Sequence, residues 1–226
     1  MGKILLTRPQ KLSQKIAQDL AKKNLSSLIQ PLFSIIKLDN LQLPSTKLQA
    51  VIITSQNAVF ALQKLGITKD ILILAIGNKT ALEVNKLGYS NALFANNSAT
   101  SLFNLAKKTL TKNNAQDDLV LYLSGEIITL DLARKLQDLG FLARRMVVYK
   151  TKESIKLLPA TVDEIANGNV AEIWFYSKRT IEIFYKLAKE HNLLKYLEQI
   201  KILCFSKAMA NFAKKIGFLN INIIKK

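Results

Sequence analysis

The sequence predicts two α/β domains with largely parallel sheets. Apolar runs of strand character alternate with amphipathic segments of helical periodicity, as in a chain of βα units. Several of the apolar runs contain no polar residue, which indicates strands whose sheet is covered on both faces. The same order of features recurs in the two halves of the 226-residue chain, which is long enough to form two hydrophobic cores.

The runs that predict strands are short and rich in Ile, Leu and Val. They are KILL (3–6), AVII (50–53), ILILAI (71–76), LVLYL (119–123), MVVY (146–149), EIWFY (172–176) and IKILCF (200–205). After two of these runs, apolar residues recur at intervals of three, first Val59, Leu62 and Leu65, then Ala81, Val84 and Leu87. This spacing places the apolar side chains on one face of a helix.

Glycines mark the expected ends of several helices. In KLGI (64–67), KLGY (86–89), DLGF (138–141) and KIGF (215–218), Gly follows the last apolar residue and precedes another. Gly readily adopts the left-handed conformation that closes a helix, and the following residue packs back onto it. These glycines therefore indicate helix C-caps and not phosphate-binding loops.

An internal duplication defines the expected domains. The same shift along the chain places ILILAI on IKILCF and KLGY on KIGF. The second half lacks a first strand of its own, which KILL at the N-terminus is able to supply. We therefore expect one discontinuous domain of residues 1–36 and 152–226, with residues 37–151 inserted as the other, and a hinge where the chain crosses twice.

Composition narrows the classes of function. No apolar stretch reaches the roughly 18 residues of a membrane span. The apolar stretch at the start of the chain is too short for the core of a secretory signal, so we expect a cytoplasmic protein. The single cysteine, Cys204, excludes an internal disulfide and a multi-cysteine metal site. The single histidine, His191, lies in a polar helical stretch and argues against a Ser-His-Asp hydrolase. We expect no metal, and a monomer.

The chain is strongly basic, with 33 Lys and Arg residues against 16 Asp and Glu residues and a net charge of +17. Lysines and arginines attract phosphates and carboxylates, so this charge favours an anionic partner. Five of the basic residues are arginines and the lysines are spread along the chain, as on solvated helix faces or in the product of an AT-rich genome. The charge alone therefore does not identify a ligand.

Polar residues follow the predicted strands where the next helices begin. The stretch ITSQNAV (53–59) has this position, and so do LTRPQ (6–10), AIGNKT (75–80), LSGE (123–126), YSKRT (176–180) and FSKAM (205–209). In open parallel sheets ligands bind beyond the carboxyl ends of the strands, where unpaired helix N–H groups attract anions. Any one Ser or Thr here is better explained as an ordinary helix cap. Together, however, these junctions predict a cleft between two facing domains that binds a ligand with many carboxylates or phosphates.

Tyr149 ends the run MVVY, where the chain is expected to leave the inserted domain. Its hydroxyl is therefore expected to face the cleft, where a tyrosine is able to donate a proton or a hydrogen bond without a cofactor. The alternative is that Tyr149 only packs at the domain junction.

In their order and spacing, these motifs resemble the uroporphyrinogen-III synthase family over almost the whole chain. The resemblance is carried by ILLTRP at the start, PLFSI (31–35), ITSQNAV, AIGNKTA, LYLSGE, VVYKT, FYSKRTIEIF and FSKAMANFAKKIGF. It implies two Rossmann-like parallel-sheet domains joined by a two-stranded connector, with the substrate in the cleft between them. It also implies a cofactor-free lyase (hydro-lyase) of haem biosynthesis that converts hydroxymethylbilane to uroporphyrinogen III. That substrate is a linear tetrapyrrole with an acetate and a propionate on every ring.

The resemblance also implies the roles of individual residues. Tyr149 matches the tyrosine that assists departure of the substrate hydroxyl. Substrate-binding residues are expected at Thr7, Arg8, Ser55, Gln56, Asn57, Gly77, Thr80, Ser124, Gly125, Ser177 and Ser206. Two positions depart from the family pattern: Tyr176 stands where a threonine is usual, and SKAMA (206–210) replaces a GPTTA-like turn. Backbone N–H groups would survive either change, whereas side-chain contacts there stay open.

Two other functions remain open. The chain is also compatible with a non-catalytic, basic two-domain module that binds nucleic acid or another polyanion, although it lacks aromatic-rich strands and a basic recognition helix. A cytoplasmic solute-binding protein with the same cleft but no chemistry is the third possibility. The isomer of the product formed from hydroxymethylbilane separates these readings, and the synthase predicts no nucleic-acid or membrane partner.

Overall fold

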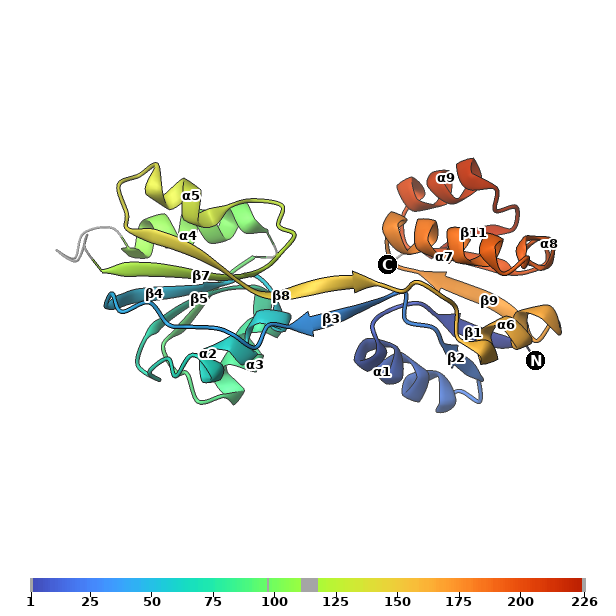
Figure 1. Cartoon of the computed structure of the whole chain (residues 1–226), viewed down its shortest axis with the longest axis horizontal. Helices are drawn as coiled ribbons and strands as arrows, with labels where there is room; N and C mark the ends of the chain where they lie inside the picture. The colour runs from blue at the N-terminus through green and yellow to red at the C-terminus, as the bar shows by residue number, and fades with distance from the viewer. Residues whose placement is uncertain (1, 97, 111–117, 225–226) are drawn as a thin grey trace. The chain divides into compact units, whose positions relative to one another are not determined.

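The structure is a computed structural model and describes residues 2–96, 98–110 and 118–224 (Figure 1). By their contacts, Met1–Ser34 and Lys152–Lys226 form one compact unit, here called unit 1, and Ile35–Thr151 form unit 2. The chain passes between the units within strands β3 (Phe33–Lys37) and β8 (Ala143–Glu153).

Unit 1 is built on a parallel sheet. In the described residues it has five strands in the order β11-β10-β9-β1-β2, and each neighbouring pair is parallel. The strands are β1 (Lys3–Leu6), β2 (Ser27–Ile29), β9 (Val170–Phe175), β10 (Lys201–Cys204) and β11 (Ile221–Ile223). The predicted strand KILL is thus β1, and it lies next to β9 as the duplication requires.

Helices cover both faces of the unit 1 sheet, because alternate strand residues point to opposite faces and both sets are apolar. Leu5, Ile173 and Phe175 pack in the large core with α6 (Pro159–Ala166), α7 (Lys178–Glu190), α8 (Leu194–Leu197) and α9 (Lys207–Ile216). Ile4 and Leu6 pack on the other side against Leu20 of α1 (Gln10–Ala21). Figure 1 shows α1 on one face of the sheet and α7 and α9 on the other.

Unit 2 has a mixed sheet. Its strand order, in the part of the chain that the structure describes, is β3-β8-β7-β4-β5-β6. The remaining strands are β4 (Leu48–Ile53), β5 (Leu72–Ile76), β6 (Ala92–Ala95) and β7 (Leu119–Gly125), and all pairs from β8 to β6 are parallel. Backbone hydrogen bonds from Leu38 to Val148 and from Ser154 to Leu32 show that the β3 and β8 segments run antiparallel.

Both faces of the unit 2 sheet are also covered. Val51 and Ile53 pack with Leu62 of α2 (Phe60–Lys64) and Val84 of α3 (Gly77–Lys86). Ala50 and Ile52 pack on the opposite face against α4 (Ala99–Leu110) and α5 (Leu132–Gln137). A short 3₁₀ helix, η1 (Gln56–Ala58), precedes α2.

The helix ends follow the glycine pattern. Gly66, Gly88, Gly140 and Gly217 all have positive φ, as predicted for C-caps. At Gly217, which ends α9, the backbone is in the left-handed region and the following Phe218 is buried in the core.

One predicted junction is wrong. No helix starts directly after LSGE (123–126), because β7 extends to Gly125 and α5 begins only at Leu132, capped by Asp131. The helices after LTRPQ and AIGNKT do start as expected, but neither N-terminus has a side-chain cap. Among the described helices, none is both long and apolar enough to cross a membrane.

Candidate functional site

Unit 2 contains a cavity of about 630 Å³ at the carboxyl ends of the neighbouring strands β4, β5 and β7, beside β8. The residues that line it come from these strands, from the loops that follow them and from the start of α4. They are Thr54, Ser55, Ile76, Ser98, Ala99, Thr100, Tyr122, Gly125, Ile127, Ile128, Thr129, Leu130 and Tyr149. This is the edge of a parallel sheet at which ligands are expected to bind.

Tyr149 and Gly125 lie against each other in this cavity. They are register partners in β8 and β7, next to an irregularity between Ser124 and Gly125. A Cβ atom added to Gly125 would lie 2.6 Å from Cζ of Tyr149 and 2.8 Å from its hydroxyl oxygen. Real Cβ contacts are longer than 3.0 Å, so the phenol ring occupies this position only because residue 125 has no side chain.

Arg145 fixes the end of β7 next to Tyr149. Its Nε donates to Oγ of Ser124 at 2.9 Å, and its Nη2 donates to the carbonyl oxygens of Gly125 at 2.8 Å and Glu126 at 2.7 Å. Three bonds from one planar guanidinium hold the backbone in a single arrangement. Sequence reasoning did not identify Arg145, because its role depends on the pairing of β7 with β8.

A pair of hydroxyls lies inside the cavity. The Thr54 and Tyr122 hydroxyl oxygens are 3.2 Å apart, so one donates to the other. Burial raises the pKa of Tyr122, and the hydrogen bond with Thr54 and the charge of Arg145 oppose this shift. Tyr122 therefore stays neutral and is able to donate a hydrogen bond. The sequence pattern identified Tyr122 only as part of an apolar strand.

Residues at the N-terminus of α4 also line the cavity, and the sequence analysis did not predict them as site residues. Oγ of Ser98 accepts a hydrogen bond from the backbone N–H of Ser101 at 3.0 Å, which caps the helix beside Ala99 and Thr100. A signal was present, since Ser98 directly precedes a segment with apolar residues at helical spacing. It was not used because the preceding strand, β6, is short.

The predicted site residues of unit 2 fall into two groups. Ser55, Gly125 and Tyr149 line the cavity together. The others lie outside its lining: Gln56 and Asn57 are exposed, Gly77 and Thr80 are buried in α3, and Ser124 is buried and bonded to Arg145. The hydroxyl of Ser55 accepts a bond from the N–H of Asn57 at 3.2 Å and so caps η1.

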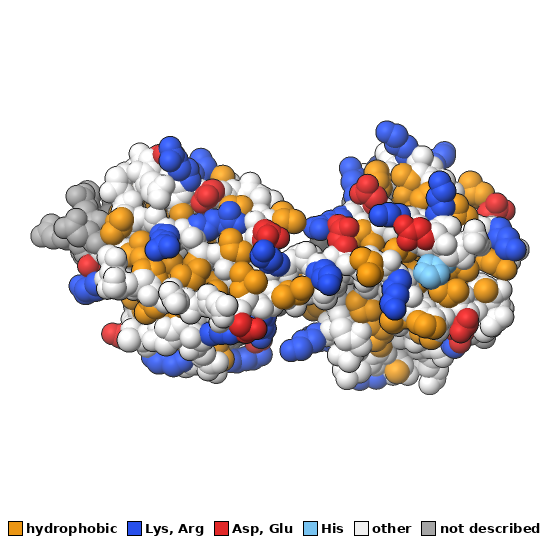
Figure 2. Space-filling model, viewed as in Figure 1, with side chains coloured by type: hydrophobic (Ala, Val, Ile, Leu, Met, Phe, Trp, Pro, Cys, Tyr) orange, Lys and Arg blue, Asp and Glu red, His pale blue; other side chains and the backbone are white. Residues whose placement is uncertain are grey.

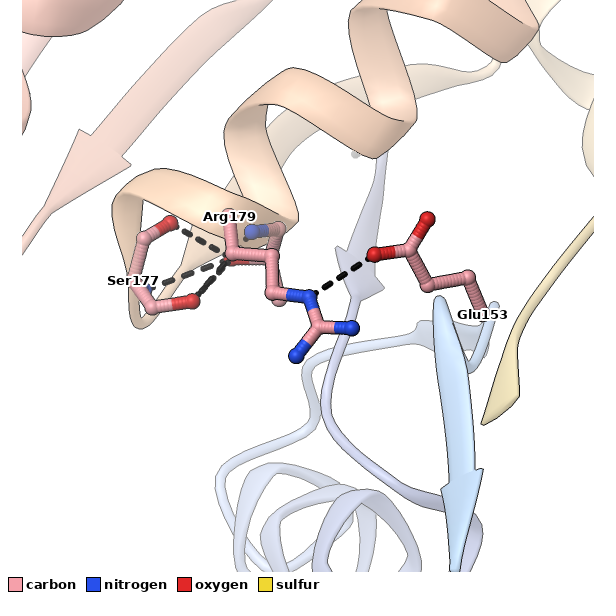
Figure 3. A network of polar contacts seen from close by, with 4 residues as sticks. Glu153, Ser177 and Arg179 are labelled. Carbon is pink, nitrogen blue, oxygen red and sulfur yellow. Dashed lines mark hydrogen bonds and ion pairs between the residues drawn. The ribbon is translucent and has the colours of Figure 1, made fainter. Parts of the chain in front are cut away.

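Polar residues in unit 1 gather at the carboxyl ends of β1, β9 and β10. Ser177 caps α7 in a capping box with Thr180, in which each side chain accepts from the other residue's backbone N–H. The neighbouring Arg179 forms an ion pair with Glu153 at 2.8 Å, and Figure 3 shows the guanidinium reaching from the start of α7 toward this carboxylate. Ser206 likewise caps α9 by accepting from the N–H of Met209 at 3.2 Å.

Thr7 and Arg8 follow β1 but have different surroundings. Thr7 is fully buried and donates to the carbonyl oxygen of Trp174 at 2.6 Å, so its side chain ties β1 to β9. Arg8 is partly buried, and its guanidinium carbon lies 4.7 Å from the centre of the Tyr176 ring. Tyr176 in turn stacks on Phe205, with ring centres 4.6 Å apart.

Neither Cys204 nor His191 belongs to the cavity. Cys204 is buried in β10, as expected, and burial raises the pKa of its thiol to about 11. His191 was expected on the solvated surface but is partly buried at the end of α7, where its Nε2 accepts from the N–H of Leu157 at 3.4 Å. Among the described residues, no group of three or more His, Cys, Asp or Glu side chains is arranged to hold a metal ion.

Comparison with solved structures gives the fold a counterpart over the whole chain. The chain resembles the uroporphyrinogen-III synthetase of Helicobacter pylori 26695 with a TM-score of 0.64 and 22% identity, over 100% of this chain and 93% of that one. It also resembles a mutant uroporphyrinogen III synthase of the extremely thermophilic bacterium Thermus thermophilus, with a TM-score of 0.52 and 16% identity over the same shares, 100% and 93%. At these identities the likeness concerns the fold. A search of curated proteins finds no significant match.

Membership rests on the family comparison. The family model described as uroporphyrinogen-III synthase HemD matches residues 14–226, which include the whole unit 2 sheet with its cavity and every strand of the unit 1 sheet except β1. A match of this length takes in nearly the whole chain. The chain therefore belongs to the uroporphyrinogen-III synthase HemD family.

Proposed function

We propose that this protein is a uroporphyrinogen-III synthase, which cyclises hydroxymethylbilane to uroporphyrinogen III with inversion of the last pyrrole ring. The observation that carries the proposal is the family match over residues 14–226. It favours this function over the alternative of a non-catalytic module that binds a polyanion. The net charge of +17 also suits a substrate with a carboxylate pair on every ring.

Tyr149 is proposed as the catalytic residue. Its phenol lies in a cavity lined by hydroxyls and apolar side chains at the carboxyl edge of the sheet. In the proposed reaction it donates a hydrogen bond or proton to the terminal hydroxyl of the substrate, which leaves as water. Loss of the pyrrole N–H proton then leaves an azafulvene with an electrophilic methylene carbon.

Ring closure follows from the electrophile. The substituted carbon of the last ring attacks the methylene carbon and gives a spiro intermediate, in which that ring carbon has two bridging bonds. Cleavage of the older bond and reclosure at the free carbon invert the ring, and loss of a proton restores the pyrrole. Without the protein, the free carbon attacks directly and the uninverted isomer I forms.

The main task of the protein in this proposal is therefore positioning. A 100-fold preference for one closure requires only about 2.7 kcal/mol of differential stabilisation. A few hydrogen bonds to the folded tetrapyrrole supply a free energy of this size, at roughly 1 kcal/mol or more each. Gly125 and Arg145 serve this purpose indirectly, since they set the position of the Tyr149 ring and of the backbone beside it.

Substrate binding is proposed at the strand ends of each unit. In unit 2 the residues are Ser55, Gln56, Asn57, Gly77, Thr80, Ser124 and Gly125, and in unit 1 they are Thr7, Arg8, Ser177 and Ser206. Because the side chains of Thr7 and Ser124 are buried and bonded within the protein, these two residues are proposed to bind substrate through their backbone atoms. We further propose that the enzyme is a hydro-lyase, acts as a monomer and works in the cytoplasm without a cofactor.

The product isomer tests the function. Freshly prepared hydroxymethylbilane is incubated with and without the protein, the products are oxidised to porphyrins, and isomers I and III are separated by chromatography. We expect isomer I alone without protein and predominantly isomer III with it. An isomer ratio that the protein leaves unchanged would refute the proposal, and heat-denatured protein provides the control for non-specific effects of a basic polymer.

A further inference from the structure

We propose that Arg8, Tyr176 and Phe205 form a carboxylate-binding subsite in unit 1, with Tyr176 as a positioning residue that also contacts the ligand. The inference rests on the proposed function for the identity of the ligand, a tetrapyrrole carboxylate. It assigns roles to two aromatic residues, Tyr176 and Phe205, for which the proposed reaction has no other use. Its basis is the geometry of these three side chains.

The three residues come from distant parts of the sequence and meet through the sheet. Arg8 follows β1, Tyr176 follows β9, and Phe205 follows β10, which are neighbouring parallel strands in the order β10-β9-β1. Each residue therefore lies just beyond the carboxyl end of its strand, so the three form a row along one edge of the sheet. This is the edge at which parallel sheets bind ligands.

Contacts along the row hold Arg8 in place. The rings of Tyr176 and Phe205 are stacked with centres 4.6 Å apart and planes 18° apart. The guanidinium carbon of Arg8 lies 4.7 Å from the centre of the Tyr176 ring, within the range of a cation–π interaction. A guanidinium that lies over an aromatic ring keeps its N–H groups free at the edges of its plane. The stack thus orients a cation in advance and lowers the entropy lost when an anion binds.

In the part of the chain that the structure describes, the polar side-chain atoms of Arg8 and Tyr176 have no hydrogen-bond or ion-pair partner. By contrast, Arg179 is neutralised by Glu153, and Arg145 donates from Nε and Nη2 to Ser124 and to backbone carbonyls. Arg8 and Tyr176 therefore present donors with no competing acceptor.

The protonation state of Tyr176 agrees with this role. Burial raises the pKa of Tyr176, and the nearby charge of Arg8 lowers it by less. The hydroxyl therefore stays protonated at neutral pH and acts as a donor. One cation and one neutral donor are complementary to a carboxylate, which accepts several hydrogen bonds at once.

Steady-state kinetics with hydroxymethylbilane tests the subsite. We expect Arg8→Gln to raise KM about tenfold and Tyr176→Phe, which keeps the ring stack, to raise it about threefold, with kcat within about twofold of wild type in both. Lys11→Gln is the matched control, because it removes one exposed positive charge three residues further along the same segment. If it raises KM as much as Arg8→Gln does, only the general charge matters and the proposal fails.

The double variant distinguishes a shared carboxylate from two separate effects. If Arg8 and Tyr176 bind the same group, Arg8→Gln with Tyr176→Phe raises KM by clearly less than the product of the two single increases. Increases that multiply, or unchanged KM values in both single variants, overturn the proposal. Equal unfolding midpoints for the variants and wild type confirm that the fold is intact.

A binding measurement keeps this inference separate from the proposed function. Uroporphyrin III, a coloured octacarboxylate, is titrated into the protein while the fluorescence of Trp174, the single tryptophan, is followed. The quenching curve gives an apparent Kd for uroporphyrin III. An apparent Kd that rises about tenfold in Arg8→Gln but not in Lys11→Gln supports the subsite even if the isomer assay is negative. Absence of quenching in wild type, or equal quenching in all variants, counts against it.

Discussion

Gly125 and Tyr149 illustrate how two residues 24 positions apart depend on each other. The phenol ring lies so close to the Cα of Gly125 that any side chain at position 125 would overlap it. Sequence reasoning named both as site residues but not their contact, because the contact depends on an irregular register between β7 and β8. It also did not show that Thr7 and Ser124 point inward, since a polar residue at a strand end has no periodic pattern that fixes its direction.

We expect Tyr149→Phe to lower kcat for isomer III about 10- to 100-fold, because the departing hydroxyl loses its hydrogen-bond donor. The unfolding free energy should change by less than about 0.5 kcal/mol, since no partner of the Tyr149 hydroxyl is lost within the described residues. Single-turnover rates and urea unfolding measure the two quantities. Tyr196→Phe, which changes a partly buried tyrosine of α8, is the matched control and should keep full activity. Full activity in Tyr149→Phe would remove Tyr149 from the mechanism.

Gly125→Ala should destabilise the protein by about 1–3 kcal/mol and reduce activity, because the new methyl group displaces the Tyr149 ring. The clash is with the Tyr149 ring. Gly125→Ala should therefore lower the unfolding free energy by less when it is introduced into Tyr149→Ala, where the ring is absent. Chemical denaturation of the four proteins gives this double-mutant cycle. Additive effects would mean that the ring does not lie against Gly125.

The buried thiol of Cys204 makes stability depend on pH. Burial raises its pKa to about 11, whereas an unfolded cysteine has a pKa of about 8.5 to 9. Since the folded pKa is the higher one, this contribution to stability is complete below about pH 8.5 and is lost as the pH rises toward 11. Between about pH 8 and pH 11, wild type should lose about 2 kcal/mol more unfolding free energy than Cys204→Ala. Equal losses in both proteins would show that the thiol is not protected.

At the level of helices and strands, local patterns were sufficient wherever the apolar signal was strong. All seven runs predicted as strands are strands, and the four glycine C-caps have the expected positive φ. The strands β2, β3, β6 and β11 were missed because they carry few fully buried side chains, whereas the equally short β1, β5 and β10 are mostly buried. With β6 unrecognised, the start of α4 was not identified as part of a strand-to-helix junction, and so Ser98 and Thr100 were absent from the predicted site.

The hydroxyl caps at the strand ends have a structural role that is measurable separately from binding. Ser177→Ala removes the acceptor for the Thr180 N–H and breaks the capping box of α7, so it should cost about 1 kcal/mol of unfolding free energy. Ser177→Asp keeps an acceptor and should recover most of this loss. Urea unfolding provides the measurement, with Ser45→Ala in an exposed loop as the neutral control. An Asp variant as unstable as the Ala variant would show that the cap is not the cause.

At the level of the whole molecule, composition alone gave only the sign of the ligand's charge. Figure 2 shows Lys and Arg side chains scattered over the visible face, with no single basic stripe of the kind that binds nucleic acid. The ordered series of weak motifs was more informative, because it led to the family that the comparison of residues 14–226 supports. No periodicity or charge pattern in the chain specifies a tetrapyrrole, so the substrate came from resemblance and the position of the cavity from the structure.

The most direct test of the central claim is the fraction of isomer III formed from hydroxymethylbilane as the protein concentration increases. Spontaneous closure to isomer I competes with the enzyme at a fixed rate, so a synthase should raise this fraction from near zero to near one as its concentration rises. The same titration with Tyr149→Phe should reach the same limit, but only at a higher concentration. A fraction of isomer III that stays near zero at every wild-type concentration would contradict the account.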